Sequence, residues 1–355
     1  MSEQTLTSAA AARGPLAMEA VALSKDFRIG RGHTLHAVRD VSFNLYRGAV
    51  VALVGESGSG KSTAAKLLAG QERPTSGTIQ LDGKPVEVSS RSDFRHYKSE
   101  VQLVFQDPFS SLNPIHTVRH HLERPVKLHH RSVDVSQEVV ALLEQVRLTP
   151  ARQFLPKYPH ELSGGQRQRV SFARALAARP SVLLADEPVS MLDVSIRLEM
   201  LSLLDDLRQR FRLAMLYITH DIASARYFAD EILVMYAGEI VERGPAEEVT
   251  QLPAHPYTQL LVASAPDPDN LGSTLRGGSR RHGPGVTSAR PQDAGGAAQG
   301  CPFSPRCPFA DDQCRREDPP LMQLSATRGA ACWHLDAAAP ELVSVPRGGE
   351  DSKTR

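Results

Sequence analysis

The chain has 355 residues, and its 41 basic and 40 acidic side chains leave a net charge of +1. This balance excludes bulk charge as an argument for binding nucleic acid or anionic lipid. No apolar run approaches the roughly 20 residues that span a bilayer, and Met1 to Met18 lacks the pattern of an export signal. We expect a soluble, cytosolic chain with one large core and an appendage, or with two domains.

The region from Glu19 to Leu45 has the apolar alternation of two strands, with a turn at Gly30-Arg31-Gly32 between them. We expect an antiparallel layer here, and further short strands at 77–83 and 101–105. Phe27 precedes the next motif, where its ring can stack on a purine base or pack as a half-buried strand residue.

A glycine-rich stretch directly follows the apolar run Val50 to Val54 and satisfies the pattern G-x-x-x-x-G-K-S/T. Such a loop wraps backbone N–H groups around phosphate oxygens, and the next helix points its positive end at the same anion. Lys61 adds a full charge, and Ser62 can ligate Mg²⁺. The expected nucleotide-binding residues are Gly55, Glu56, Ser57, Gly58, Ser59, Gly60, Lys61, Ser62 and Thr63.

Residues 107–180 read as a helical insertion, because apolar residues from Val135 to Val146 recur at helical spacing. We expect prolines to break this segment into short pieces at Pro108, Pro114, Pro125, Pro150, Pro156 and Pro159. A second helix N-terminus suited to an anion is predicted at Leu162, Ser163, Gly164, Gly165 and Gln166. Since one ATP cannot fill two loops on separate lobes, we expect this second loop to cap the nucleotide of another subunit.

Two apolar strands are followed by polar residues that suit phosphate chemistry. The first, Pro180 to Pro188, ends in Asp186 and Glu187, and ligands bind at the carboxyl ends of such strands. We expect Asp186 to hold Mg²⁺, and Glu187 to orient the attacking water and accept its proton. The second strand, Ala214 to Ile218, is followed by His220, which can contact a γ-phosphate.

These stretches, in this order, resemble the nucleotide-binding subunit of an ATP-binding cassette (ABC) transporter over about residues 18–265. The resemblance implies a P-loop NTPase of the α/β class, with an antiparallel β layer and a helical signature subdomain. It also implies that two subunits sandwich two ATP molecules, and that Ser163 and Gly165 of one subunit reach the phosphate bound by the other.

Residue by residue, the resemblance implies further roles in ATP hydrolysis. Met191 departs from the family pattern, because a small residue is usual in that part of the D-loop. The implied roles are Phe27 as the adenine-stacking aromatic, Gln106 as the Q-loop glutamine that senses Mg²⁺ and touches the membrane subunit, Asp186 as the Walker B aspartate, Glu187 as the catalytic glutamate, His220 as the switch histidine and Asp193 as the D-loop aspartate.

The C-terminal part begins with a stretch from Gly272 to Gly300 that is rich in Gly, Ser, Arg and Ala, and it reads as a linker. Beyond it lie all four cysteines, separated by five, six and seventeen residues, unlike the C-x-x-C pairs of zinc ribbons. From the residues alone, an iron–sulfur cluster, a zinc ion and unligated thiols all stay open. The candidate ligands are Cys301, Cys307, Cys314 and Cys332.

This tail resembles the C-terminal extension of oligopeptide/dipeptide importer ATPases over about residues 255–335. The residues that carry the resemblance are His255-Pro256-Tyr257, Pro305-Arg306-Cys307-Pro308 and Cys332-Trp333-His334. It implies uptake of short peptides, a related second ATPase, two membrane permeases and an extracytoplasmic binding protein. It also implies a place on the cytoplasmic face of the plasma membrane, and it favours a 4Fe-4S cluster. Some members of this family instead take up nickel chelates or sugars.

The predicted organisation is a disordered start (1–17), an ABC domain (18–254) with its helical subdomain at about 107–180, a C-terminal extension (255–335) and a disordered tail (336–355). A soluble ABC ATPase that acts on nucleic acid or ribosomes is the alternative function. Proteins of that class usually carry two cassettes or a long coiled coil, and this chain has one cassette and no sustained heptads. We therefore expect no nucleic-acid partner.

Overall fold

The computed structural model describes residues 14–29, 33–87, 90–107, 111–130, 132–265 and 300–343. The predicted linker, apart from Gly300, lies outside these ranges, as do residues 1–13 and 344–355 of the predicted disordered ends. Strand β1 begins at Leu16, inside the segment predicted to be disordered, and helix α15 carries regular structure on to Val343.

The N-terminal strands form the antiparallel layer that the sequence predicts, in the order β2-β1-β4-β5. Antiparallel pairing of β1 with β2 starts where Leu16 faces Tyr46, which is why β1 begins so early. The strands are β1 (Leu16–Ile29), β2 (His33–Tyr46), β4 (Ser76–Leu81) and β5 (Lys84–Pro85).

The second sheet has the order β11-β12-β10-β9-β3-β8-β7-β6, counted over the described part of the chain. Its central strands run parallel from β9 to β6. Every residue of β3, β7, β8 and β9 is buried, as expected for parallel strands that are covered on both faces. The strands are β3 (Val50–Val54), β6 (Val101–Val104), β7 (Val182–Asp186), β8 (Ala214–Thr219), β9 (Glu231–Tyr236), β10 (Glu239–Pro245), β11 (Met322–Gln323) and β12 (Gly329–Ala330).

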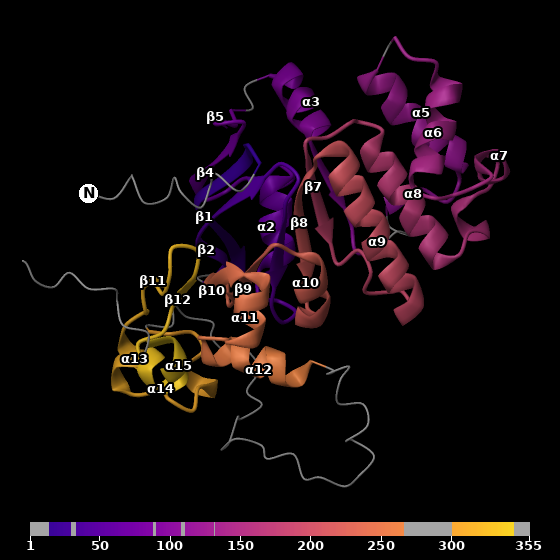
Figure 1. The fold of residues 1–355 in the computed structure, drawn as a ribbon. Coiled ribbons are helices and arrows are strands. Elements are labelled where there is room, and N and C mark those ends of the chain that lie inside the picture. The colour runs from indigo at the N-terminus through magenta and orange to yellow at the C-terminus, as the bar shows by residue number, and fades with distance from the viewer. Residues whose placement is uncertain are drawn as a thin grey trace, which may run out of the picture.

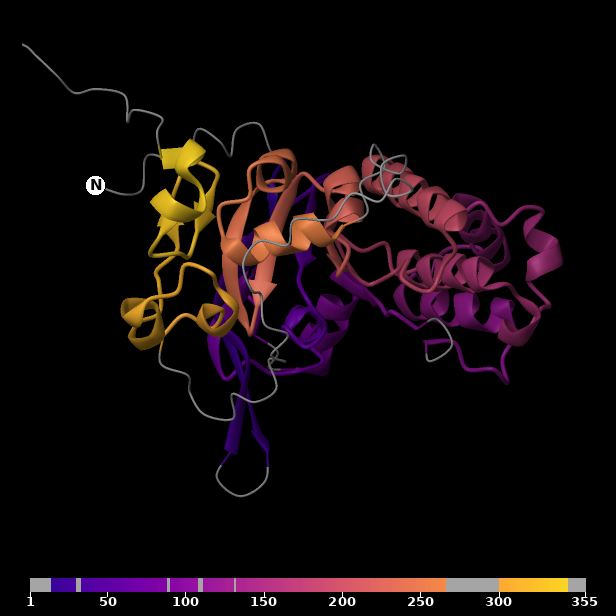
Figure 2. The ribbon, with the colours of Figure 1, turned by 90° about the horizontal axis from the view of Figure 1, so that it is seen from below.

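One group of helices forms a lobe on one side of this sheet, and the C-terminal extension lies on the other side (Figures 1 and 2). The lobe comprises α5 (Val118–His129), α6 (Val135–Gln145), α7 (Ala151–Phe154), η1 (Pro159–Glu161) and α8 (Gly164–Leu176). The core carries α2 (Lys61–Leu68), α3 (Arg91–Glu100), α9 (Val194–Phe211), α10 (Ile222–Phe228) and α11 (Ala246–Gln251). The extension carries α12 (Pro256–Ser264), η4 (Ser304–Arg306), α13 (Asp312–Arg316), α14 (Leu335–Ala338) and α15 (Pro340–Val343). None of the described helices is long and apolar enough to cross a membrane.

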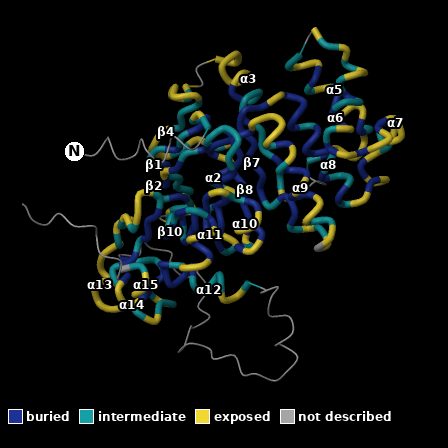
Figure 3. The backbone as a smooth tube through the Cα atoms, viewed as in Figure 1, coloured by how far each residue is buried: buried dark blue, intermediate teal, exposed yellow. Residues whose placement is uncertain are grey.

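Strand β3 separates two hydrophobic cores because its side chains alternate between the faces of the sheet. Val50, Ala52 and Val54 belong to the core that includes the helical lobe. Val51 and Leu53 belong to the core of the antiparallel layer and α2. Buried residues accordingly concentrate along the central strands, and exposed residues along the outer helices (Figure 3). The loop after β3 is therefore anchored from both sides.

Proline does not break the helical segment at Pro125, and that part of the prediction is wrong. Pro125 lies inside α5, where it removes one backbone hydrogen bond. The same helix buries Val118, Leu122 and Val126 completely in the lobe. Tertiary burial of this apolar face outweighs the local cost of the proline.

The C-terminal extension is built into the core sheet, since β12 pairs with β10. A buried ion pair fixes this joint: Arg328 Nη2 lies 3.0 Å from Glu242 Oε1, and the two side chains are 3% and 0% exposed. The Glu242 carboxylate also accepts hydrogen bonds from the backbone N–H groups of Ala254 and His255, at 2.9 and 2.8 Å. Core and extension therefore share one continuous polar contact.

We expect Arg328→Ala to lower the free energy of unfolding by about 3–5 kcal/mol, because it leaves the buried carboxylate of Glu242 without its counter-charge. Urea denaturation of the full chain measures this change. The matched control is Arg316→Ala, which removes an arginine whose ion pair with Asp312 is 76% exposed on both sides and should change stability by less than about 1 kcal/mol. Equal effects of the two substitutions would contradict the structural role of the pair.

Candidate active site

Three neighbouring parallel strands, β3, β8 and β7, end at the same edge of the sheet. Val54 at the end of β3 lies opposite Thr219, and Asp186 at the end of β7 lies opposite Ile218. The glycine-rich loop follows β3, Asp186 ends β7 with Glu187 directly after it, and His220 follows β8. The register alone therefore collects three of the predicted motifs at one edge, where open α/β sheets bind ligands.

The loop after β3 requires glycine at two positions. A Cβ atom on Gly55 would lie 2.2 Å from the carbonyl oxygen of Met235, and one on Gly60 would lie 2.2 Å from that of Ala37. Gly60 also has φ = 106° as it caps α2, which is the left-handed region that glycine tolerates. These close approaches fix the loop at the N-terminus of α2.

Lys61 lies inside this loop with only 5% of its surface exposed. Its Nζ donates hydrogen bonds to the carbonyl oxygens of Gly55 and Glu56, each at 2.7 Å. Burial lowers its pKa, and the nearby carboxylates of Glu187 and Asp186 oppose that shift. The loop thus holds an ammonium group among carboxylates, in the place where an anionic ligand would find a helix N-terminus and a cation together.

Asp186 and Ser62 offer the oxygen ligands that Mg²⁺ prefers. Ser62 Oγ donates to Asp186 Oδ1 at 3.2 Å, so the hydroxyl and the carboxylate already lie side by side. Burial raises the pKa of Asp186, and the hydrogen bond from Ser62 lowers it. A divalent cation bound here would offset the cost of burying this carboxylate, and the residues present fit Mg²⁺.

Two side chains from neighbouring strand ends contact the carboxylate of Glu187. Gln106 Nε2 donates to Glu187 Oε2 at 2.9 Å, and His220 Nδ1 lies 3.2 Å from the same oxygen. The backbone of Glu187 has φ = 44°, an uncommon value for a residue other than glycine, and its N–H donates to Ile218 O at 2.9 Å. The sheet edge thus imposes the position of this carboxylate, and Gln106 and His220 restrict its orientation.

The signature residues lie in the helical lobe. Ser163 is exposed and caps α8, its hydroxyl accepting from Gln166 N–H at 3.3 Å, and Gln166 Oε1 accepts from Ser163 N–H at 3.0 Å. Leu162 and Gly165 are buried, and Gly164 is half-buried. The Ser163 hydroxyl at the N-terminus of α8 therefore faces solvent on the helical lobe.

The remaining predicted residues lie on other elements. Phe27 is half-buried on β1, with Lys25 Nζ 4.9 Å from the centre of its ring. Asp193 is exposed at the N-cap of α9, without a side-chain capping bond. Met191, the departure from the family pattern, is 62% exposed beside it. These side chains are accessible to a second subunit.

The sequence analysis missed how closely the extension approaches the phosphate loop. Tyr257 of α12 accepts a hydrogen bond from the backbone N–H of Glu56 at 2.8 Å. Arg306 pairs with both carboxylate oxygens of Glu56, at 2.9 and 3.0 Å. His255 is fully buried and caps α12, and burial lowers its pKa to about 3, so it stays neutral there. The motif His-Pro-Tyr is visible in the sequence, but nothing in its spacing indicates that Tyr257 contacts Glu56.

The four cysteines, Cys301, Cys307, Cys314 and Cys332, line one small cavity of about 10 Å³ in the extension. Burial raises the pKa of all four thiols, to about 12 for Cys301 and about 11 for Cys332. Among the described residues, the ligand atoms that gather within 4.8 Å of one another are those of Asp311, Cys314 and His334. The other three sulfurs lie outside that tight group.

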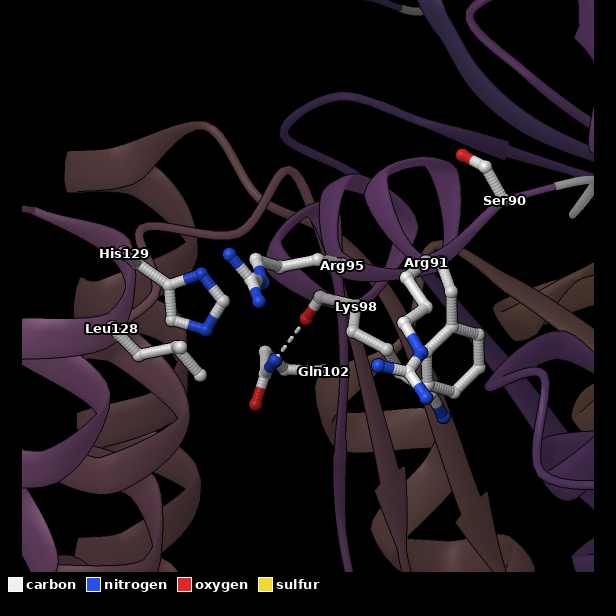
Figure 4. A pocket seen from close by; sticks show the side chains of 8 residues that line it. Ser90, Arg91, Arg95, Lys98, Gln102, Leu128 and His129 are labelled. Atoms are coloured by element: carbon white, nitrogen blue, oxygen red, sulfur yellow. Dashed lines mark hydrogen bonds between the residues drawn. The ribbon is translucent and has the colours of Figure 1, made fainter.

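A basic groove of about 670 Å³ lies between α3 and the C-terminal end of α5 (Figure 4). Lys98 Nζ donates to Ala69 O at 2.5 Å, so the groove lies near the C-terminal end of α2, opposite the phosphate loop. Phe94 and Leu128 are exposed in it. The lining residues are Ser90, Arg91, Phe94, Arg95, Lys98, Gln102, Leu128 and His129.

Comparison with protein families gives two matches along the chain. Residues 38–190 match the family described as ABC transporter. Residues 241–314 match the C-terminal region of oligopeptide/dipeptide transporters. The first match covers the phosphate loop through the acidic pair Asp186 and Glu187, and the second covers most of β10, all of α12 and the first three cysteines.

Individual relatives cover most of the chain. A probable peptide ABC transporter ATP-binding protein of Sinorhizobium fredii is 41% identical over 87% of this chain and 86% of its own length. A di/tripeptide transport ATP-binding protein of Pseudomonas aeruginosa is 39% identical over 88% of this chain and 96% of its own. An oligopeptide transport ATP-binding protein of Bacillus subtilis is 39% identical over 84% and 89%.

Solved structures show the same fold over the nucleotide-binding part. A component of the cbiONQ ABC transporter complex of Clostridium perfringens is 28% identical, with a TM-score of 0.59, over 67% of this chain and 91% of its own. A dimeric bacterial ABC transporter cassette is 27% identical, with a TM-score of 0.58, over 64% and 98%, and it is also solved with ADP and phosphate.

Proposed function

This chain belongs to the ABC transporter family, and on that premise we propose that it is the ATP-hydrolysing, energy-coupling subunit of an importer of di- and oligopeptides. The observation that carries the enzymatic part is the convergence of Gln106 and His220 on Glu187, beside Lys61 and Asp186. Relatives from three bacteria are named as peptide, di/tripeptide or oligopeptide transport proteins, and these names support peptides as the cargo.

The proposed reaction uses each side chain at the sheet edge in one role. Lys61 and the loop N–H groups bind the β- and γ-phosphates, while Ser62, Asp186 and Gln106 would hold Mg²⁺. When bound, Mg²⁺ neutralises charge that develops on the phosphate oxygens. Glu187 accepts a proton from the attacking water, and His220 contacts the γ-phosphate. Phe27 stacks on the adenine, and Asp193 with residues 162–166 completes the site of a neighbouring subunit.

We expect Glu187→Gln to keep ATP binding and to lower turnover by about 10²–10⁴-fold, because the amide cannot accept the proton of water. Phosphate release and equilibrium binding of ATP measure the two effects separately. Glu248→Gln, an exposed position on α11, is the matched control and should leave both unchanged. A Glu187→Gln variant that hydrolyses ATP at the normal rate would refute this assignment.

The proposed partners are a homologous ABC ATPase, two membrane permeases and an extracytoplasmic binding protein, with this chain on the cytoplasmic face of the plasma membrane. The net charge of +1 gives no support for a nucleic-acid partner. The groove between α3 and α5 is the surface we assign to a permease, because it combines exposed apolar side chains with Arg91, Arg95 and Lys98. Helix α3, which lines the groove, leads directly into β6, and Gln106 follows the end of β6. Because Gln106 donates to Glu187, this path connects the groove to the proposed catalytic carboxylate.

We expect the double substitution Arg91→Glu and Arg95→Glu to reduce co-purification with detergent-solubilised permeases at least tenfold, since it reverses the charge of the groove. Intrinsic ATP binding should stay within twofold, because the groove lies at the far end of α2. Arg226→Glu, a single charge reversal at an exposed position on α10, is the control. Unchanged co-purification of the double variant would place the permease elsewhere.

We also propose that the four cysteines hold a 4Fe-4S cluster, for which four thiolate ligands are usual. A tetrahedral zinc with bonds of about 2.3 Å would need its four sulfurs about 3.8 Å apart. All four thiols line one cavity, yet among the described residues only Cys314 belongs to a group of ligand atoms gathered within 4.8 Å. The four sulfurs are therefore not gathered as closely as one zinc ion requires, which supports the larger cofactor. The residues present therefore fit the cluster.

An anaerobic preparation is expected to be brown and to contain about four irons per chain, with Cys307→Ser losing both properties. Metal analysis and the visible spectrum measure this result. The control Ser304→Ala changes a neighbouring hydroxyl without removing a thiol. A colourless preparation that contains zinc would overturn the proposal.

A further inference from the structure

Glu56 is the point at which the C-terminal extension meets the phosphate loop. All three of its polar groups are engaged: its carbonyl oxygen accepts from Lys61 Nζ, its N–H donates to Tyr257, and its carboxylate pairs with Arg306. One of these partners is the loop's own lysine, and two belong to the extension. A residue in the second position of the loop thus connects the extension to the ammonium of Lys61.

Arg306 is held in place before it reaches Glu56. Its guanidinium carbon lies 5.6 Å from the ring centre of Phe303 and 5.9 Å from that of Tyr236. Phe303 is buried in the main core, where its ring packs edge-on against Tyr236 at 5.3 Å. The side chain of Arg306 is 13% exposed and that of Glu56 is 33% exposed, so solvent screens the pair only in part.

The segment that carries Arg306 also lines the cysteine cavity, through Cys301, Phe303, Ser304 and Cys307. The short helix η4 that ends at Arg306 lies between Cys301 and Cys307, and both cysteines pack against the main core. Tyr257 is fully buried and its ring centre lies 5.5 Å from that of Phe303. The two groups that contact Glu56 therefore belong to one packed unit, since both contact the ring of Phe303.

We propose that Arg306 and Tyr257 are positioning residues of the nucleotide site, through which the C-terminal extension sets the affinity of the phosphate loop for ATP. This inference rests on the proposed ATPase function. Both side chains act through Glu56 of the loop: Arg306 neutralises its carboxylate, and Tyr257 accepts from its N–H and so fixes the peptide whose carbonyl accepts from Lys61.

The charge argument gives a specific direction. Without Arg306, the carboxylate of Glu56 stays unpaired next to a loop that must accept a triphosphate, and like charges repel. Removing the Glu56 charge as well relieves this repulsion. A purely structural contact would behave differently: it is already lost in Arg306→Ala, so removing the Glu56 charge as well would recover no affinity.

The experiment measures the dissociation constant of Mg-ATP for the full chain by titration calorimetry, in the Glu187→Gln background so that ATP is not consumed. Arg306→Ala is expected to weaken binding about five- to twentyfold, Arg306→Lys less, and Tyr257→Phe about two- to fivefold. Adding Glu56→Gln to Arg306→Ala is expected to recover most of the lost affinity. Arg316→Ala is the matched control, because this arginine of the extension is exposed and pairs with Asp312.

Two results would overturn the inference while leaving the ATPase function intact: unchanged affinity in Arg306→Ala and Arg306→Lys, or a double variant that binds no more tightly than Arg306→Ala alone. If Arg306→Ala does not fold, Arg306→Lys and Tyr257→Phe carry the same comparison. Failure of the Glu187→Gln chain itself to bind Mg-ATP would overturn the inference and the proposed function together.

Discussion

The parallel register of β3, β8 and β7 is the constraint on which the candidate site depends. It ends three buried strands at one edge, so Lys61, Asp186, Glu187 and His220 meet although they come from distant parts of the chain. The two cores that cover β3 hold this edge from both faces. The phosphate loop then needs only glycine at its two closest approaches and a helix behind it to form an anion site.

This edge of the sheet supplies one half of the proposed ATP site. It supplies the loop, the cation ligands and the base, whereas Ser163 and the N-terminus of α8 face solvent from the helical lobe. A second subunit that offers the same lobe would close over the first loop, and a ligand that bridges both would favour the closed pair by its contacts in that state. In this proposal, hydrolysis removes the ligand that bridges the two halves, and the pair reopens.

The sequence predicts the core well because its motifs are local. Five consecutive apolar residues and a glycine loop predict β3, the turn and α2, and the acidic pair after Leu184 and Ala185 predicts the next strand end. Pro125 shows the limit of such reasoning, since only the buried contacts of α5 reveal that the helix continues through it. Long-range pairs are similarly hidden: Arg306 and Glu56 are 250 residues apart, and no spacing joins them. The place of β12 in the core sheet depends on the same kind of contact.

The central claim is that each site is completed by a neighbouring subunit. The most direct test is the ATP turnover of a Ser163→Arg chain assembled with its permeases and partner ATPase. The account predicts that turnover of the assembly falls at least twofold, because the bulky cation blocks the loop that caps the neighbouring nucleotide. The isolated chain should still bind ATP as before, since its own phosphate loop is unchanged. Full turnover in the Ser163→Arg assembly would contradict the account.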